Sequence, residues 1–381
     1  MNSKNAMNSL DSINSKHHLG HYDTPLLAAI LALVVGSVVM VYSSSSVVAL
    51  TTYDDPAYFM KRQIMWAVIG LTLMAVAMHM DHRLLQKRRA VLILLIVSLL
   101  LLASTLIPGV GRMINGSRRW LRFGFVSFQP SELAKFTIVV YMSSYIVKKS
   151  EMLRDFRNGL FPAYLVTGVF LLLALRQPDF GAAMTLAGVA GIMLFAGGAN
   201  LLQLGGTVLA ALPFVYVAVA HSAYRARRIF SFLDPWSDPQ GAGHQIIQSF
   251  LAFGSGGVFG RGLGEGRQKL LFLPERHSDF IYAVIGEELG LIGALAVVML
   301  FLIILWRGVR IALASGDPFS RLLALGITLL ICFQGLINML VVTGLLPTKG
   351  ITLPLMSYGG SSLVITMIAL GVLLNISKET S

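Results

Sequence analysis

The chain has 381 residues, of which 55% are hydrophobic and only 13% are charged, and its mean hydropathy is +0.73. Soluble domains carry about a quarter of their residues as charged side chains, so this composition excludes a soluble globular enzyme and a disordered chain. The formal net charge is +12, but most basic residues flank long apolar runs and do not form one stripe. This pattern favours a polytopic membrane protein and gives no support to nucleic-acid binding. The single cysteine, Cys332, excludes an internal disulfide framework.

Ten apolar stretches approach the length of about 20 residues that a membrane-spanning helix needs. We therefore expect an all-α membrane protein with spans near 24–44, 63–79, 90–107, 131–147, 160–175, 181–197, 200–220, 280–304, 321–342 and 359–375. The polar N-terminal segment lacks the apolar core of a signal peptide, so it is expected to remain as a tail. The predicted organisation is a cytoplasmic tail over 1–22, a membrane domain over 23–375 with a large extracytoplasmic loop over 221–280, and a second cytoplasmic tail over 376–381.

The distribution of lysine and arginine predicts the orientation of the spans. The loops after the second, fourth and eighth spans are basic and lie on the same side as both termini, which is therefore the cytoplasmic side. Their cations are Arg83, Lys87, Arg88, Arg89, Lys148, Lys149, Arg154, Arg157, Arg307 and Arg310. The short outer loop after the third span breaks this rule with Arg112, Arg118, Arg119 and Arg122. Two interpretations are equally good: arginine forks that bind an anionic ligand, or arginines that snorkel to lipid headgroups.

An ionisable side chain is predicted inside the fourth span. Pro130 suits the start of a helix, which places Glu132 in the first turn and Lys135 about one turn inside the membrane. An intramembrane cation that faces a cavity is a functional candidate. The alternative is an internal ion pair with Glu132 that fixes helix packing. Trp120, in the preceding loop, suits a membrane interface.

Two aspartates directly precede predicted spans. Asp179 either caps the sixth span or meets an arginine of a neighbouring outer loop. Ser278 or Asp279 caps the eighth span; alternatively, because the helix dipole favours its ionised form, Asp279 serves as a base or a cation ligand. Glu287 and Glu288 follow about two turns later, and at least one of them must face inward or find a partner.

The large loop contains an amphipathic stretch near 244–253, with Gln248 and Ser249 on its polar face and Phe250 on its apolar face. The glycine-rich stretch that follows lacks the Gly-Lys-Ser/Thr of a P-loop and the preceding strand of a dinucleotide fold. In the ninth span, Gln334 and Asn338 share a helix face, a pattern more typical of interhelical hydrogen bonds than of a site.

These motifs together resemble the SEDS family of bacterial cell-wall polymerases, and its division members more than its elongation members. The matching stretches keep one order along nearly the whole chain: Arg119-Trp120, Gln129 to Lys135, Gln177-Pro178-Asp179, Tyr224-Arg225 with Arg228, Asp234-Pro235-Trp236, Gln248-Ser249, Leu273 to Ile281, Ile285 to Glu288, Pro347 to Gly350, and Ser357 to Ser362. The chain departs from the family pattern at Phe180 and Ala182, and Leu271 stands where some division members carry a glutamate.

The resemblance implies a peptidoglycan glycosyltransferase that polymerises lipid II at the periplasmic face of the bacterial inner membrane during septal cell-wall synthesis. It also implies, as partners, a class B penicillin-binding protein acting as transpeptidase, other division proteins and membrane lipids. Asp279 corresponds to the family's proposed catalytic aspartate and is expected to act as a general base. Substrate contacts are expected from Arg119, Trp120, Glu132, Lys135, Asp179, Arg228, Gln248, Ser249, His277, Ser278, Lys349 and Ser361.

This assignment is chemically consistent, because a pyrophosphate leaves readily once cations neutralise it, so that one base suffices. The sequence shows no dedicated metal-ligand cluster, and a divalent cation such as magnesium or manganese stays open as a cofactor. The alternatives are a lipid II flippase, an elongation-type polymerase and a structural scaffold for division partners. The lack of an evident inverted repeat and the crowding of candidate residues on one membrane face favour surface chemistry over transport.

Overall fold

The computed structural model describes residues 21–114, 117–124, 126–220, 228, 230–241, 243–266 and 276–379. Its helices are α2 (Thr24–Tyr53), α3 (Tyr58–His79), α4 (Arg88–Ser104), α5 (Pro130–Lys148), α6 (Phe161–Arg176), α7 (Phe180–Ala196), α8 (Leu201–Ala220), α10 (His244–Gly256), α11 (Ile281–Glu288), α12 (Gly290–Ala314), α13 (Pro318–Val342) and α14 (Gly360–Glu379). Short helical turns are η1 (His82–Gln86), η2 (Ser150–Met152), η3 (Phe156–Leu160) and η4 (Pro235–Ser237). Each predicted span coincides with one helix except the eighth, which is divided between α11 and α12.

Several helices begin at aspartate followed within two residues by proline. The Asp23 carboxylate accepts a hydrogen bond from the backbone N–H of Leu26 at 2.9 Å, and Pro25 lies in the first turn of α2. Asp317 caps α13 in the same way, through the N–H of Ser320 at 2.9 Å. These side chains satisfy N–H groups that the first helical turn leaves unpaired, and proline supplies no N–H that needs a partner.

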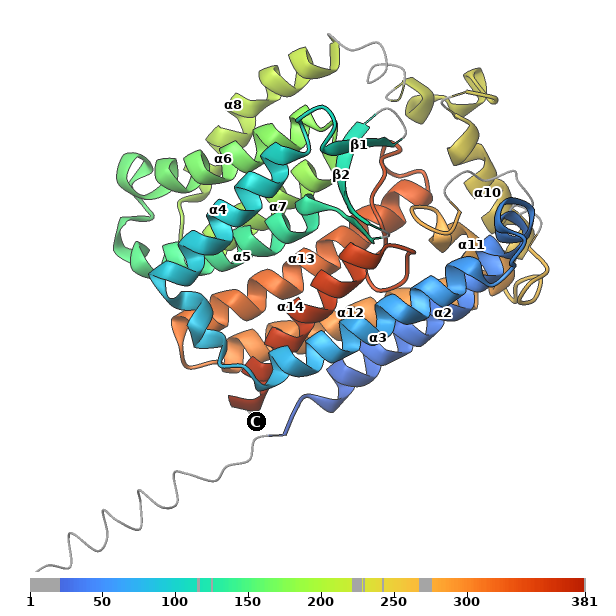
Figure 1. Ribbon diagram of the computed structural model, residues 1–381. Helices are drawn as coiled ribbons and strands as arrows, with labels where there is room; N and C mark the ends of the chain where they lie inside the picture. The colour runs from blue at the N-terminus through green and yellow to red at the C-terminus, as the bar shows by residue number, and fades with distance from the viewer. Residues whose placement is uncertain are drawn as a thin grey trace, which may run out of the picture.

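Helix α13 runs through the middle of the bundle. It packs against α12 on one side, against α5 and α7 on another, and against α14, as Figure 1 shows. Helix α14 in turn packs along α3, which pairs with α2. The central position of α13 explains why its polar side chains contact several other elements at once.

The outer surface of the bundle is apolar. Large side chains such as Val35, Ile93, Leu172 and Leu291 are more than half exposed. Within the described ranges, six helices are long and apolar enough to cross a membrane by length and composition: α2, α3, η3 with α6, α12, α13 and α14. An apolar exterior around a packed interior is the arrangement that a lipid environment stabilises.

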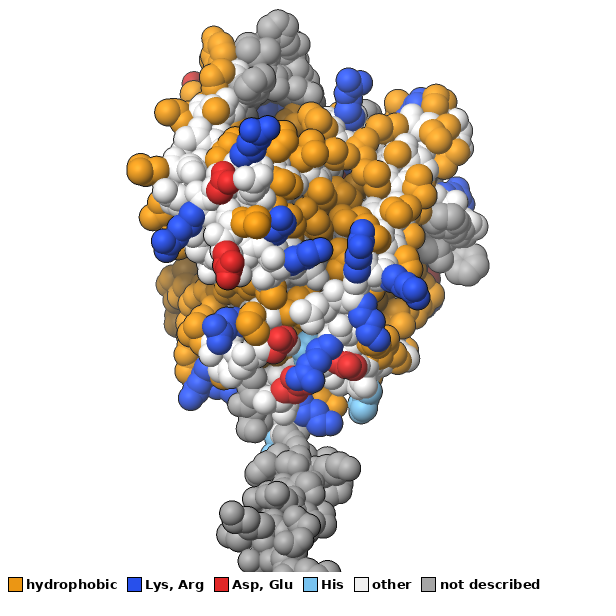
Figure 2. Space-filling model, turned by 90° about the vertical axis from the view of Figure 1, so that its left-hand side faces the viewer, with side chains coloured by type: hydrophobic (Ala, Val, Ile, Leu, Met, Phe, Trp, Pro, Cys, Tyr) orange, Lys and Arg blue, Asp and Glu red, His pale blue; other side chains and the backbone are white. Residues whose placement is uncertain are grey.

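Both ends of the described chain lie at one end of the bundle, which we call the terminal end; the opposite end is the distal end (Figure 1). The backbone N–H of Asp23 donates to Ser377 Oγ at 3.2 Å, and Arg307 Nε lies 2.8 Å from Asp23 Oδ2. Arg83 pairs with Glu379 at 3.0 Å. Figure 2 shows Lys and Arg side chains spread over the face that lies on the left of Figure 1.

The connection between α4 and α5 forms a small antiparallel sheet that the sequence did not indicate. Its strands are β1 (Gly111–Ile114), β2 (Ser117–Phe123) and β3 (Val126–Phe128), in the order β1-β2-β3. Arg112 pairs with Trp120, and Leu121 pairs with Phe128. The fold is therefore helical with one small sheet, whose short strands satisfy one another's backbone groups at the distal end.

The eighth predicted span is broken at Gly290, whose φ is +68°. A Cβ atom there would overlap the backbone of Val258 and Gly260, so the glycine permits both the conformation and the close approach. The N–H of Leu291 donates to the carbonyl of Gly257 at 2.9 Å. The glycine-rich stretch after α10 thus packs against the break between α11 and α12.

The two carboxylates just before this break are fully buried. Ser43 Oγ lies 2.6 Å from Glu288 Oε2, and Ser255 Oγ lies 3.5 Å from Glu287 Oε1. The N–H of Gly264 donates to Glu288 Oε2 at 3.2 Å. The expectation that a carboxylate of this pair faces inward is confirmed for both residues.

Candidate functional site

The candidate residues meet at the distal end, where α5, α7 and α14 begin and α13 ends. Asp279 lies in a turn over residues 276–280, directly before α11. Its side chain is half-buried, and a Cβ atom built on Gly350 would lie 2.9 Å from Asp279 Oδ2. The segment that holds Asp279 therefore lies against the connection between α13 and α14.

The interpretation of Ser278 or Asp279 as a helix cap is wrong. The N-cap residue of α11 is Phe280, and no side chain caps this helix. The physical reason is that the chain makes a turn through residue 280 before the helix starts, which displaces Asp279 from the cap position. Asp279 therefore lies in the turn that precedes the helix and does not occupy its N-cap position.

Two cationic side chains lie at the connection between α13 and α14. Arg228 Nη1 donates to the carbonyl of Thr348 at 3.0 Å. Lys349, the next residue, directs Nζ toward α7, 2.6 Å from Met184 Sδ and 5.8 Å from the centre of the Phe180 ring. Burial, reinforced by the positive charge of Arg228, lowers the pKa of the Lys349 ammonium. A partly desolvated ammonium beside a guanidinium is an environment that an anion stabilises.

Asp179 performs both of the tasks that the sequence left open. Its Oδ1 accepts from the backbone N–H of Ala182 at 3.1 Å and so caps α7. Arg119 Nη1 lies 3.9 Å from the same oxygen, and Arg119 Nε donates to the carbonyl of Gln177 at 3.1 Å. Through Arg119, strand β2 thereby holds the turn over residues 177–179, and α7 begins directly after this turn at Phe180.

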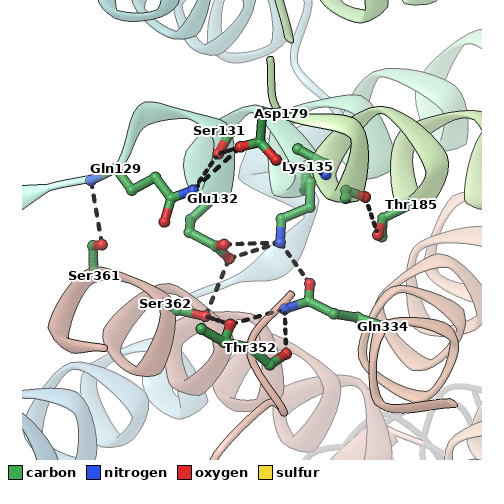
Figure 3. A network of polar contacts seen from close by, with 12 residues as sticks. Gln129, Ser131, Glu132, Lys135, Asp179, Thr185, Gln334, Thr352, Ser361 and Ser362 are labelled. Atoms are coloured by element: carbon green, nitrogen blue, oxygen red, sulfur yellow. Dashed lines mark hydrogen bonds and ion pairs between the residues drawn. The ribbon is translucent and has the colours of Figure 1, made fainter. Parts of the chain in front are cut away.

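A polar network links Asp179 to α5 and α14 (Figure 3). Ser131 Oγ donates to Asp179 Oδ2 at 3.2 Å, and Gln129 Nε2 reaches the same oxygen at 3.3 Å. The backbone N–H of Gln129 donates to Ser361 Oγ at 3.2 Å. Ser361 is buried, and its hydroxyl oxygen accepts this hydrogen bond from the protein backbone.

Lys135 lies deeper in the same network, only 4% exposed. Its Nζ lies 2.9 Å from both carboxylate oxygens of Glu132 and 2.5 Å from Gln334 Oε1 (Figure 3). Ser362 Oγ donates to Glu132 Oε2 at 3.3 Å, and Gln334 Nε2 donates to the carbonyl of Thr352 at 3.1 Å. This geometry matches the alternative of an internal ion pair, with α13 and α14 supplying the remaining partners.

One residue on α10 lies on a different face than the sequence predicted. Ser249 is fully buried and donates to the carbonyl of Val342 at 2.6 Å, whereas Phe250 is 38% exposed. The reason is that α10 packs its Ser249 face against the end of α13, where the last carbonyls of that helix need donors. Ser249 is therefore a helix-end partner in this structure, while Gln248 is half-buried on the same helix.

His277 belongs to an aromatic cluster. Its ring lies 4.8 Å from that of Phe59 and 5.5 Å from that of Tyr358, measured between centres. The backbone carbonyl of Ser278 accepts from Ser357 Oγ. Trp120 is half-buried in β2. These contacts tie α3 and the start of α14 to the segment that contains Asp279.

Sequence reasoning assigned no role to three residues that contact Lys349 or Asp279. Met184 and Phe180 flank Lys349, and Gly350 leaves the space beside Asp279. Met184 carries no sequence signal, while a glycine directly after an outer-face lysine was a signal for close approach. Arg225, Leu271 and the first residues of the Leu273 motif lie outside the described residues.

Within the described ranges, no group of three or more His, Cys, Asp or Glu side chains is arranged to hold a metal ion.

A family model for FtsW, RodA and SpoVE, described as a cell cycle protein, matches residues 24–381. A probable peptidoglycan glycosyltransferase FtsW from Trichlorobacter lovleyi is 50% identical over 97% of this chain and 96% of its own. Stage V sporulation protein E of Bacillus subtilis is 42% identical over 93% of this chain and 96% of its own.

Solved structures are similar as well. A chain from a peptidoglycan synthase complex that coordinates polymerisation and crosslinking has a TM-score of 0.78 and 31% identity, covering 94% of this chain and 98% of the other. The rod shape determining protein RodA of Thermus thermophilus has a TM-score of 0.68 and 28% identity, covering 94% and 97%. With these relatives and its apolar helices, the chain is a multi-pass membrane protein. It belongs to the FtsW, RodA and SpoVE family, the SEDS family that its motifs resemble.

Proposed function

We propose that this chain is a peptidoglycan glycosyltransferase of the FtsW type, which polymerises lipid II into glycan strands during septal cell-wall synthesis. Relatives that carry this name match it at about half of all positions along nearly their whole length. The observation that carries the proposal is the position of the Asp279 carboxylate against Gly350, in the segment that carries Lys349 and whose Thr348 carbonyl accepts a hydrogen bond from Arg228. The segment 348–350 thus contacts the carboxylate, binds Arg228 through its Thr348 carbonyl and carries Lys349.

Asp279 acts as the general base. The acceptor hydroxyl forms a bond to the anomeric carbon of the donor sugar, while the bond from that carbon to the pyrophosphate oxygen breaks. The hydroxyl proton passes to the Asp279 carboxylate, and the electron pair leaves with the lipid pyrophosphate. Asp279 lies in the turn directly before α11 and is partly accessible, which suits a residue that accepts this proton.

Lys349 and Arg228 stabilise the negative charge that develops on the departing pyrophosphate. Partial burial strengthens this interaction, because a desolvated cation attracts an anion more strongly than a hydrated one. Arg119 and Asp179 position the turn before α7, and Phe180 at the start of this helix lies beside Lys349. The ion pair of Lys135 with Glu132 supports the site from deeper in the bundle.

The same proposal specifies how the chain is oriented in the membrane and which partners it has. The terminal end, with its exposed basic side chains, faces the cytoplasm, and the distal end faces the periplasm. Lipid II approaches the distal end from the outer leaflet. A class B penicillin-binding protein is the transpeptidase partner, in keeping with the structural similarity to a chain of a synthase complex that coordinates polymerisation and crosslinking.

The test is a polymerisation assay with the purified chain and labelled lipid II in detergent, with and without the transpeptidase. A detergent micelle does not separate two aqueous compartments, so lipid II transport produces no signal in this assay. We expect glycan strands that lengthen with time. If the folded chain, alone and with the partner, yields no polymer while it moves lipid II across a reconstituted bilayer, the proposal is wrong and the flippase alternative is right.

A further inference from the structure

Three consecutive backbone carbonyls of the segment that ends at Asp279 accept hydrogen bonds from α13 and the connection to α14. The carbonyl of His277 accepts from the N–H of Tyr358 at 2.9 Å. The carbonyl of Ser278 accepts from Ser357 Oγ at 2.5 Å, and that of Asp279 accepts from Asn338 Nδ2 at 2.8 Å. Residues 277–279 are therefore held in place through their backbone carbonyls.

Asn338 contacts both sides of the proposed site. Its Nδ2 donates one hydrogen to the carbonyl of Asp279 and lies 2.6 Å from the carbonyl of Ile351, two residues after Lys349. The residue is 1% exposed, and its Oδ1 has no hydrogen-bond partner among the described residues. The side chain is thus used as a double donor, a capacity that aspartate, leucine and serine lack.

One helical turn earlier, Gln334 holds the next carbonyl of the same connection. Its Nε2 donates to the carbonyl of Thr352 (Figure 3), so Gln334 and Asn338 fix two consecutive residues, Ile351 and Thr352, to one face of α13. Side chains four residues apart lie on the same face of a helix, which explains this pairing. The segment that carries Lys349 is therefore positioned from α13.

Ser357 forms the second bridge. Its Oγ accepts from the backbone N–H of Leu353 at 2.8 Å and donates to the carbonyl of Ser278. The hydroxyl is nearly fully buried, so water does not replace either bond readily. Ser357 thus joins the turn over 353–357 to the segment that contains Asp279.

We infer that Asn338 and Ser357 are positioning residues of the glycosyl transfer: they fix the Asp279 carboxylate relative to the Lys349–Gly350 segment without contacting substrate. This inference rests on the proposed function. A misplacement of about 1 Å in a reacting group can reduce the rate by about a hundredfold, so loss of either bridge lowers kcat more than it raises KM.

The experiment measures lipid II polymerisation by the full chain with its transpeptidase. Asn338→Leu removes both donors at similar volume, and Ser357→Ala is compared with Ser357→Thr, which keeps the hydroxyl. We expect kcat to fall about 10- to 100-fold in Asn338→Leu and about tenfold in Ser357→Ala, with KM changed by less than about twofold. Ser357→Thr should recover most of the loss.

The matched control is Asn375→Leu at the terminal end, because Asn375 Nδ2 also donates to a backbone carbonyl, that of Met78, at 2.8 Å. This variant should lose thermal stability as the other variants do, yet keep the kcat of the wild type. Equal kcat losses in the Asn375 and Asn338 variants would show a general packing effect and overturn the inference. If Asn338→Leu does not fold, the Ser357 pair decides, and equal rates for alanine and threonine overturn the inference as well.

Asp279→Asn separates this inference from the proposed function. If Asp279→Asn is inactive while Asn338→Leu and Ser357→Ala keep the wild-type kcat, the positioning role alone is wrong. If Asp279→Asn keeps the wild-type rate, the proposed function is wrong in its general base, whatever the rates of the positioning variants.

Discussion

Asp279 and Gly350 approach so closely that a Cβ atom on residue 350 would lie 2.9 Å from Asp279 Oδ2. The backbone of Gly350 does not adopt a positive φ, so the glycine provides space beside the carboxylate and no special backbone conformation. Lys349 directly precedes it and directs its ammonium toward α7. One short segment therefore determines the position of a cation and the room available to the proposed base.

Gly350→Ala should lower the polymerisation rate about tenfold with little change in thermal stability. The added methyl group meets the flexible end of a side chain, which shifts by a few tenths of an ångström, so the fold tolerates it while the carboxylate leaves its position. Steady-state kinetics and a thermal unfolding curve in detergent measure the two effects. Gly359→Ala is the control, since its nearest neighbour would be Ser362 Cβ at an ordinary 3.8 Å. A Gly350→Ala enzyme as fast as Gly359→Ala would contradict the assigned contact.

The lowered pKa of Lys349 predicts that activity falls on the alkaline side, or limb, of the pH–rate profile. Burial and the neighbouring Arg228 lower its pKa, so the ammonium loses its proton at a lower pH than the ordinary lysine value of about 10.4. Because the cationic form binds pyrophosphate, kcat/KM should fall as the pH rises through this lowered pKa. Lys349→Arg keeps its charge throughout this range and should move the limb to higher pH. A limb at the same pH in both proteins would exclude Lys349 as its source.

The buried pair of Glu132 and Lys135 predicts a non-additive loss of stability. Lys135→Met leaves the Glu132 carboxylate buried without its cation, which costs about 3–5 kcal/mol of unfolding free energy. Adding Glu132→Gln removes that buried charge, so the double variant should be more stable than Lys135→Met alone. Denaturation of the three proteins in the same detergent measures the difference. A double variant that is less stable than either single variant would argue against a mutually compensating pair.

The positions of the helices were predictable from the sequence, because a lipid environment demands long apolar runs and the runs are clear. The first turn of α5 also followed from Pro130, and the capping role of Asp179 followed from its place before an apolar run. The break at Gly290 was not predictable, since its cause is the approach of residues 258–260 from a distant segment. The sheet was missed because its short strands carry arginines in place of a clear alternation.

The residues of the candidate site could be selected from the sequence, but their contacts could not. Asp279, Lys349 and Arg228 were identified from their charge and their place in motifs, and they lie near one segment in the structure. The bonds from Asn338 to the carbonyls of Asp279 and Ile351 join positions 59 and 13 residues away, and no local pattern encodes them. Lys135 pairs with Glu132 in the structure, because a buried cation needs a compensating charge, and its contact with substrate stays a prediction.

The most direct measurement compares lipid II polymerisation by wild type and Asp279→Asn, each purified with the transpeptidase partner and shown to be folded. Asparagine keeps the shape of the side chain but cannot accept the hydroxyl proton as a carboxylate does. The account predicts a rate at least about a hundredfold lower, the usual contribution of a general base. A rate within about twofold of wild type, less than any general base contributes, would contradict it.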